Sequence, residues 1–295
     1  MRRPDSLAVT ALLTALVALG PISTDLYLPS LPGLARAFGV DMPAVQLTLS
    51  VFLVGLATAQ LIYGPLSDRF GRRPVLLFGL VLYVAASIVC MLAPSIPVLI
   101  GARFAQAVGA CVGPVLGRAI VRDVYGRDGA ARVLAYMSAA MALAPALGPI
   151  LGGFLEVWFG WRANFLALVV YGSAGMILAL ALLPETNRTP DVQAAHPLRI
   201  LAGYRGLIGH RVYVGYVPCC AFAYSGIFAF ISGSSFVLMD VVGLGPDAYG
   251  FCFAAVVVGY IIGTLLAGRL SRRLGIDRLI AAGAGISLAG GLLLA

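Results

Sequence analysis

Long apolar runs separated by short polar segments make up almost the whole chain. Each run has about 18 or more residues and is long enough as a helix to cross a hydrocarbon core of about 30 Å. A membrane β-barrel would instead alternate apolar and polar residues over segments of about ten. The pattern predicts an all-α membrane protein with about nine spans, at 7–27, 44–66, 75–93, 98–120, 133–155, 165–183, 212–238, 249–270 and 279–295.

Composition and charge agree with this class. Hydrophobic residues make up 61% of the 295 residues, and the mean hydropathy is +0.99, far outside the usage of soluble domains. All twenty basic residues are arginines, and with a cytoplasmic N-terminus seventeen of them fall at cytoplasmic ends. The net charge of +8 is therefore attributed to topology and to anionic lipid, and no nucleic-acid partner is expected.

An internal repeat relates two parts of the chain. The stretch GPLSDRFG at 64–71 aligns with GRLSRRLG at 268–275, an offset of 204 positions that also carries Gly55 onto Gly259. The offset joins helices of the same direction, which predicts two parallel halves with a substrate site between them.

The repeat also predicts the domain organisation. We expect a six-helix half at 1–184, a cytoplasmic linker at 185–210 and an incomplete half of three helices at 211–295. Shifting spans four to six by the same offset places three further spans beyond residue 295. The expectation is therefore a chain of about twelve spans that is truncated after about nine.

Four stretches carry a family resemblance. GPLSDRFGRR at 64–73 resembles the signature loop of the major facilitator superfamily. TDLYLPSLP at 24–32, the fourth span at 102–133 and APALGPILGG at 144–153 together resemble the Bcr/CflA-type drug-resistance antiporters. The resemblance extends over the whole chain and implies a major-facilitator-like helical bundle.

The signature loop supplies charges of both signs, and a solvated cytoplasmic turn is its plain structural interpretation. Exposed ion pairs are worth only about 0 to 1 kcal/mol each, which suits them to biasing one of two conformations. The resemblance implies a latch that closes the cytoplasmic side. The glycines are expected to allow tight turning and close helix approach, and Asp123 at the end of span four is expected to pair with a loop arginine. The expected members are Gly64, Asp68, Arg69, Gly71, Arg72 and Asp123. The second copy has Arg272 in place of Asp68, so a latch there needs another acid, such as Asp277.

Two charges fall within spans. Asp25 is the only acidic residue well within reach of a span, toward the periplasmic end of the first helix, where an interfacial carboxylate is the structural alternative. Arg103 lies about six residues into span four, where a charge costs at least about 2.5 to 3.5 kcal/mol without a cavity or partner. Because span one runs outward and span four inward, the two residues fall at similar depth. We expect proton and substrate to compete there, and the resemblance implies the same two positions.

The proline–glycine run in span five predicts close helix packing. In the antiporter branch this motif is implied to prevent leak: Pro145, Gly148, Pro149, Gly152 and Gly153. Gly259 and Gly263 of span eight have the same spacing of four as Gly148 and Gly152, so we expect spans five and eight to cross there.

Aromatic and polar residues within the spans are candidates for lining a site for amphipathic drugs. The structural alternative is that each faces lipid or a neighbouring helix, as most helix aromatics do. The candidates are Tyr27, Phe52, Gln60, Tyr136, Tyr224 and Phe228.

These observations predict proton-coupled efflux of small amphipathic drugs across a bacterial inner membrane, by a multi-pass monomer with a cytoplasmic N-terminus. A metabolite symporter or facilitator of the same fold, or a nontransporting truncated fragment, remains open. No enzyme is expected, since an HExxH motif, a nucleophile elbow and a phosphate-binding loop are absent from the sequence. The five cysteines lie in apolar runs without metal-ligand spacing, so neither a metal nor a cofactor is expected.

Overall fold

A computed structural model describes the backbone of residues 6–294 and the side chains of all of these except 127, 128, 268, 271–274, 276, 293 and 294. Helices joined by turns make up this part of the chain, and it contains no strand. The elements follow in the order α1 (Leu7–Val17), α2 (Leu19–Asp25), η1 (Leu28–Ser30), α3 (Leu31–Phe38), α4 (Met42–Phe70), α5 (Arg72–Met91), α6 (Ile96–Ala110), α7 (Val112–Phe159), α8 (Trp161–Leu182), α9 (Pro197–Ile208), α10 (Arg211–Ser235), η2 (Phe236–Val241), α11 (Pro246–Leu274) and α12 (Ile276–Leu294).

Several helix ends coincide with residues that cap or break helices. The Ser6 hydroxyl accepts the N–H of Val9 at the start of α1, and Asp41 accepts the N–H of Ala44 at the start of α4. Both are N-caps, which satisfy backbone donors that have no partner inside the helix. Gly71 has a φ of 96°, which a side chain would disfavour, and it lets α4 turn directly into α5.

Helix α7 contains a reversal and contributes to two spans. Its backbone leaves helical geometry at Gly126, where φ is 62° and ψ is −168°. The segments Ile96–Gly126 and Gly129–Phe159 are each long and apolar enough to cross a bilayer. Helix α6 and the start of α7 therefore form the predicted fourth span, and the rest of α7 forms the fifth.

The span count is close to the predicted nine. Within the described residues seven segments are long and apolar enough to span a membrane, and eight if the bent pair Leu7–Val17 and Leu19–Phe38 is one span. This pair is the predicted first span, bent by 41° at its break. The predicted ninth span coincides with α12, which is not among those segments.

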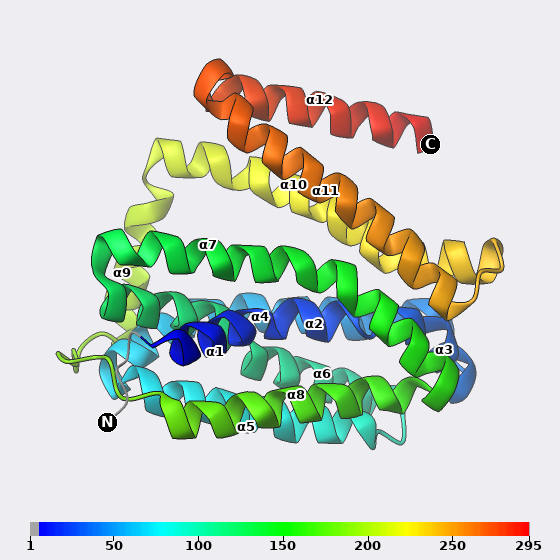
Figure 1. Ribbon diagram of the computed structural model, residues 1–295, viewed down its shortest axis with the longest axis horizontal. Helices are drawn as coiled ribbons and strands as arrows, with labels where there is room; N and C mark the ends of the chain where they lie inside the picture. Colours follow the sequence, from blue (N-terminus) through cyan, green and yellow to red (C-terminus); the bar gives the residue numbers. More distant parts are fainter. Residues whose placement is uncertain (1–5, 295) are drawn as a thin grey trace.

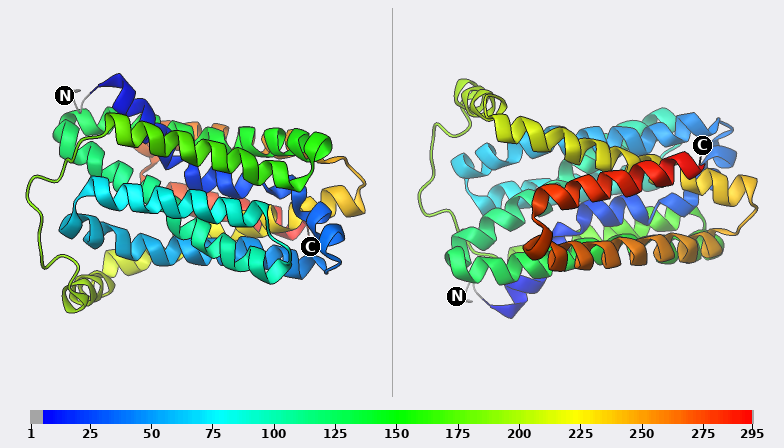
Figure 2. Two further views of the ribbon diagram at one scale, coloured as in Figure 1. Left: turned by 90° about the horizontal axis from the view of Figure 1, so that it is seen from below. Right: turned by 90° about the horizontal axis from the view of Figure 1, so that it is seen from above.

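Helices α1 to α8 form one bundle, and α10, α11 and α12 lie along one side of it (Figures 1 and 2). We call the end of the bundle with residues 64–73 and the connector 183–196 the basic end, and the other the opposite end. Helix α11 approaches α7 where α7 ends and lies farther from it toward the basic end (Figure 1). Helix α9 lies across the direction of the spans at the basic end (Figure 2).

The broken first span is the most deeply buried part of the bundle. Leu13, Leu16 and Leu19 are fully buried on α1 and α2. A Cβ atom added to Gly113 of α7 would collide with the Leu16 carbonyl oxygen, so the two backbones touch. Small residues permit such close approach between membrane helices. This packing fixes α2, and with it the position of Asp25, the last residue of that helix.

Candidate functional site

Asp25 is buried at the end of α2, with 2% of its surface exposed. The Thr24 hydroxyl lies 3.2 Å from its Oδ1 as a hydrogen-bond donor. A Cβ atom at Gly148 of α7 would be 2.9 Å from the Asp25 Cβ, so the proline–glycine helix packs directly against this side chain. Asp25 therefore lies inside the bundle, shielded from solvent.

Arg103 is fully buried on α6. Its Nη1 donates to the Ser23 carbonyl at 3.0 Å and to Gln106 Oε1 at 2.6 Å. The guanidinium carbon lies 4.1 Å from the ring centroid of Phe52 and 4.7 Å from that of Tyr27. Cation–π attraction is stronger where water is excluded, so these rings compensate for part of the lost hydration. Nε and Nη2 have no hydrogen-bond partner in this part of the structure.

The two charges are neighbours in depth without forming an ion pair. Arg103 bonds the carbonyl of Ser23, two residues before Asp25, in agreement with the predicted similar depth. Among the described side chains, no carboxylate comes within ion-pair distance of Arg103.

A buried polar network around Arg103 was not predicted from the sequence. The Ser23 and Tyr83 hydroxyls are 2.7 Å apart, and Gln106 Nε2 donates to the Ser87 hydroxyl at 2.7 Å. Ser23, Ser87 and Gln106 are all fully buried. Polar residues inside apolar runs were the available signal, since a buried polar group is usually hydrogen-bonded. The network joins α2, α5 and α6 around the guanidinium group.

A second acidic side chain also lies in a span, contrary to the prediction that Asp25 is the only one. Glu156 of α7 is half-buried and accepts a short hydrogen bond from the Ser30 hydroxyl. Asn164 Nδ2 donates to the same hydroxyl at 2.7 Å, and a Cβ atom at Gly33 would lie 2.5 Å from Glu156 Oε1. Because Gly148, Gly152 and Glu156 are spaced four apart, they share one face of α7. Glu156 thus lies on the seam that contacts Asp25, two turns nearer the opposite end.

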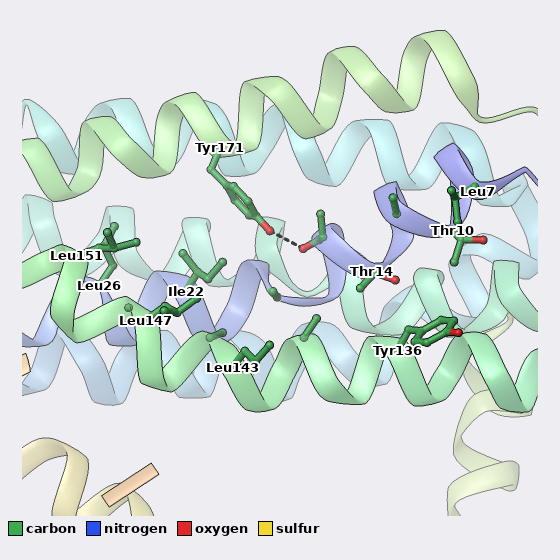
Figure 3. A pocket seen from close by; sticks show the side chains of 16 residues that line it. Leu7, Thr10, Thr14, Ile22, Leu26, Tyr136, Leu143, Leu147, Leu151 and Tyr171 are labelled. Carbon is green, nitrogen blue, oxygen red and sulfur yellow. Dashed lines mark hydrogen bonds between the residues drawn. The ribbon is translucent and has the colours of Figure 1, made fainter. Parts of the chain in front are cut away.

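An apolar groove of about 580 Å³ lies between the broken first span and α7 (Figure 3). Tyr171 of α8 borders it and donates to the Ala15 carbonyl at 2.6 Å. Gly148, which touches Asp25, also lines it. The repeat predicted a site between the two halves, whereas this groove is built by α1, α2, α7 and α8 alone. The bend was missed although Pro21 signals it, because proline has no N–H to donate to the Val17 carbonyl, where α1 ends.

The six candidate lining residues lie in different environments. Tyr27 and Phe52 are fully buried and contact Arg103, while Tyr136 lines the groove and is 54% exposed. Gln60 and Tyr224 are exposed and Phe228 is half-buried. The structure brings together only Tyr27 and Phe52, since a helix buries some of its faces and leaves others to lipid.

At the basic end Arg72 is the centre of the predicted charge cluster. Its Nη1 lies 2.5 Å from Asp68 Oδ1, and its Nε lies 3.0 Å from Asp123 Oδ2. The pairing of a loop arginine with Asp123 is as predicted. Arg69 instead lies over the ring of Phe70, 4.9 Å from its centroid.

The two loop glycines differ. A Cβ atom at Gly71 would lie 2.6 Å from Glu185 Oε2, so this glycine allows both the turn and a close approach. Gly64 lies inside α4 and has no atom within 4 Å of an added Cβ, so the turn and the close approach predicted there are both wrong.

The start of the predicted linker is docked on the signature loop. Glu185 accepts the N–H groups of Arg72 (2.9 Å) and Arg73 (3.0 Å), which begin α5. Asn187 Nδ2 donates to the Asp68 carbonyl (3.0 Å) near the end of α4. A carboxylate at a helix N-terminus is stabilised by unpaired N–H groups and by the helix dipole. The connector thus caps both helix ends that flank the loop, a contact between distant segments that local pattern does not reveal.

In the second copy of the loop, the Arg272 side chain lies outside the described residues. Asp277, the acid suggested for a latch there, accepts a hydrogen bond from the Tyr216 hydroxyl at 2.8 Å.

The proline–glycine run of α7 makes two tight contacts. A Cβ atom at Gly152 would collide with the Leu26 carbonyl, and one at Gly153 with the Pro246 carbonyl at the start of α11. Pro145 and Pro149 lie within the same helix. The predicted contact between spans five and eight exists, but its place on span eight was wrong: an added Cβ finds no atom within 4 Å at Gly259 or Gly263. At Gly250 it would lie 2.7 Å from the Pro149 carbonyl. The contact lies in the first turns of α11, where the Phe251 ring centroid is also 6.2 Å from that of Phe154 in α7.

Bilayer-spanning helices around buried charges and an apolar groove define a multi-pass membrane transporter. A family model described as Major Facilitator Superfamily matches residues 13–295, so the chain belongs to this superfamily, as predicted. It is 32% identical over 274 residues to multidrug resistance protein D of Escherichia coli strain K12, covering 92% of this chain and 68% of that protein. It is 35% identical to a chloramphenicol resistance protein of Pseudomonas aeruginosa, covering 98% and 68%. These names agree with the predicted Bcr/CflA-type branch.

The chain spans about two thirds of the length of these relatives. Among solved structures it resembles a bacterial homologue of the human lysosomal transporter Spinster in an inward-facing, occupied conformation. The TM-score is 0.70 at 20% identity, over 93% of this chain and 63% of that one. This likeness confirms the predicted helical fold.

Proposed function

We propose that the protein takes part in proton-coupled export of small amphipathic drugs, with Asp25 as the proton-binding group and Arg103 as the fixed charge beside it. The observation that carries the proposal is the burial of both side chains in one layer of the bundle, 2% and 0% exposed. Ionisable groups inside a membrane are costly, and they mark ion or substrate pathways.

The environment of Asp25 suits a group that alternates between two protonation states. Thr24 supplies its one side-chain hydrogen bond among the described residues, and no cation pairs with it. Binding or releasing a proton therefore changes the net charge of the layer that contains Arg103. A drug that approaches this layer competes with the proton, which is the requirement for exchange of one against the other.

The groove beside Asp25 has the size and chemistry for small amphipathic molecules. Its volume of about 580 Å³ is within the usual range for small-molecule sites. Its walls are mostly apolar, with hydroxyl groups from Thr10, Thr14, Tyr136 and Tyr171. The names of the relatives from E. coli and P. aeruginosa support drugs, rather than metabolites, as the substrates.

Orientation follows from charge. We assign the basic end and the N-terminus to the cytoplasm of a bacterial inner membrane, because cytoplasmic loops collect arginine. We further propose halves at 1–184 and 211–295, which meet at the opposite end through Arg36 and Asp240, 3.7 Å apart, and through Gly153 against Pro246. The site then opens toward the cytoplasm, and Gly64, Asp68, Arg69, Gly71, Arg72 and Asp123 latch that side in the alternate conformation.

The experiment is binding calorimetry on the purified 295-residue chain, with chloramphenicol and tetraphenylphosphonium as probes. Titrations at the same pH in buffers of different ionisation enthalpy report the protons released on binding. The parent chain is expected to release protons when a probe binds, whereas Asp25→Asn binds the probe with no release.

Asp41→Asn is the matched control, because it neutralises an exposed carboxylate and asparagine remains a good N-cap. Equal proton release by Asp25→Asn and the parent would place the coupling group elsewhere. Failure of the parent to bind either probe would contradict the assignment of drugs as substrates.

A further inference from the structure

Helix α9 has one side fixed against the bundle. The Tyr204 hydroxyl donates to the Leu61 carbonyl of α4 at 2.9 Å. Ile200, on the same side, is half-buried, as is Tyr204. The helix lies across the direction of the spans at the basic end (Figure 2). A helix in this orientation lies roughly parallel to a bilayer that the spans cross.

A second side of α9 is apolar and uncovered. Leu198, Leu201 and Ile208 are 70%, 65% and 69% exposed. Their spacing of three and seven residues places them on one stripe of the helix. The stripe is roughly a quarter turn from Tyr204, at about 3.6 residues per turn. It therefore faces neither the bundle nor the side of the helix that carries Gly203.

Basic residues accompany this stripe. Arg199, Arg205 and Arg211 lie in or beside α9, and no acidic residue occurs between Asp191 and Asp240. Arg199 Nη1 pairs with Asp191 at 2.5 Å, while Arg205 is exposed. Arg205 follows Leu198 by seven residues and Leu201 by four, so it shares their stripe. A long arginine side chain on an apolar stripe can lie along acyl chains while its guanidinium group reaches the headgroups.

We propose that α9 is an interfacial helix that binds anionic phospholipid in the leaflet at the basic end. The stripe of Leu198, Leu201 and Ile208 enters the boundary between headgroups and acyl chains, and Arg205 on that stripe contacts lipid phosphates. The position beside the spans, the orientation across them and the unbalanced positive charge together select a lipid surface over a second protein. This inference is independent of what the protein transports.

The test places a fluorophore on the stripe of the full 295-residue chain. Leu201→Trp is incorporated into nanodiscs, one copy per disc, that contain a minor fraction of brominated phosphatidylglycerol or of brominated phosphatidylcholine. The parent chain supplies the background from Trp158 and Trp161. We expect the added tryptophan to be quenched, and at least twofold more by the brominated anionic lipid.

Gly203→Trp is the matched control. Gly203 lies about half a turn from the stripe, and its added Cβ meets no atom within 4 Å, so a tryptophan there has space and faces away from lipid. Circular dichroism checks that each variant keeps the parent helicity. Equal quenching at 201 and 203 would overturn an interfacial position for the stripe.

Charge is tested separately with Arg205→Gln added to Leu201→Trp. The twofold preference for the anionic lipid is expected to disappear, while quenching by either lipid remains. Equal quenching by the two lipids before this change would overturn the anionic specificity. If the tryptophan becomes buried only in discs that hold two copies of the chain, a second protein covers the stripe. That result would overturn the proposal.

Discussion

Arg72 and Arg103 occupy two regions of one bundle and are stabilised in different ways. Arg72, at the basic end, has carboxylates at 2.5 and 3.0 Å. Arg103, inside the bundle, is surrounded by the rings of Phe52 and Tyr27, a backbone carbonyl and the Gln106 amide. Desolvating a second charge is costly in the interior, whereas at a wet interface it costs little. The contrast indicates why Asp25 forms no ion pair with Arg103, as the proposed proton-binding role of Asp25 requires.

The largest effect is expected for Arg103→Ala. The change removes two hydrogen bonds and the cation–π contacts, and it leaves a cavity in a closely packed site. The free energy of unfolding should fall by about 3 to 5 kcal/mol, and probe binding should be lost. Thermal unfolding in detergent, together with calorimetry, measures both.

Arg103→Lys is the conservative companion, because it keeps the charge without the planar guanidinium group. It should lie between the alanine variant and the parent in stability. A melting temperature and probe affinity unchanged in Arg103→Ala would contradict the role assigned to this cluster.

An intermediate effect is expected for Gly152→Ala, which tests the packing beneath Asp25 without changing any charge. The new Cβ collides with the Leu26 carbonyl, next to Asp25, and overpacking costs about 1 to 3 kcal/mol. Gly259→Ala is the control, because its Cβ meets no atom within 4 Å and alanine favours a helix. A loss of stability that is the same at both positions would refute the tight seam between α2 and α7.

The smallest effect is expected at the basic end. In a double-mutant cycle of Arg72→Gln and Asp123→Asn, the coupling energy should be about 0 to 1 kcal/mol and should decrease with added salt. A salt-independent coupling of several kcal/mol would mean that Arg72 is as isolated from water as Arg103, and the contrast between the two regions would fail.

The sequence predicted features that depend on local pattern. The apolar runs, the pairing of a loop arginine with Asp123 and the similar depth of Asp25 and Arg103 follow from helical rise and charge placement. The caps that Glu185 makes on α5 were not predictable, because they join segments over a hundred residues apart. The crossing at Gly250 was also missed. It depends on the angle between α7 and α11, and two glycines four residues apart in the sequence do not determine that angle.

Glu156 was overlooked for a related reason. It lies close to the end of α7, where a sequence alone does not distinguish an exposed carboxylate from one that packs beside Gly33 and accepts a hydrogen bond from Ser30. The groove required the 41° bend within the first span, which opens space between that span and α7.

Infrared difference spectroscopy of the purified chain between low and high pH tests the central claim most directly. A carboxyl C=O band should be present at low pH, disappear as the pH rises, and shift when chloramphenicol is added. It should be missing from Asp25→Asn and retained in Glu156→Gln, which removes the carboxyl that lies on the same face of α7 as Gly148. A pH difference spectrum and a chloramphenicol response that are the same in Asp25→Asn as in the parent would contradict the assignment of Asp25 as the proton-binding group.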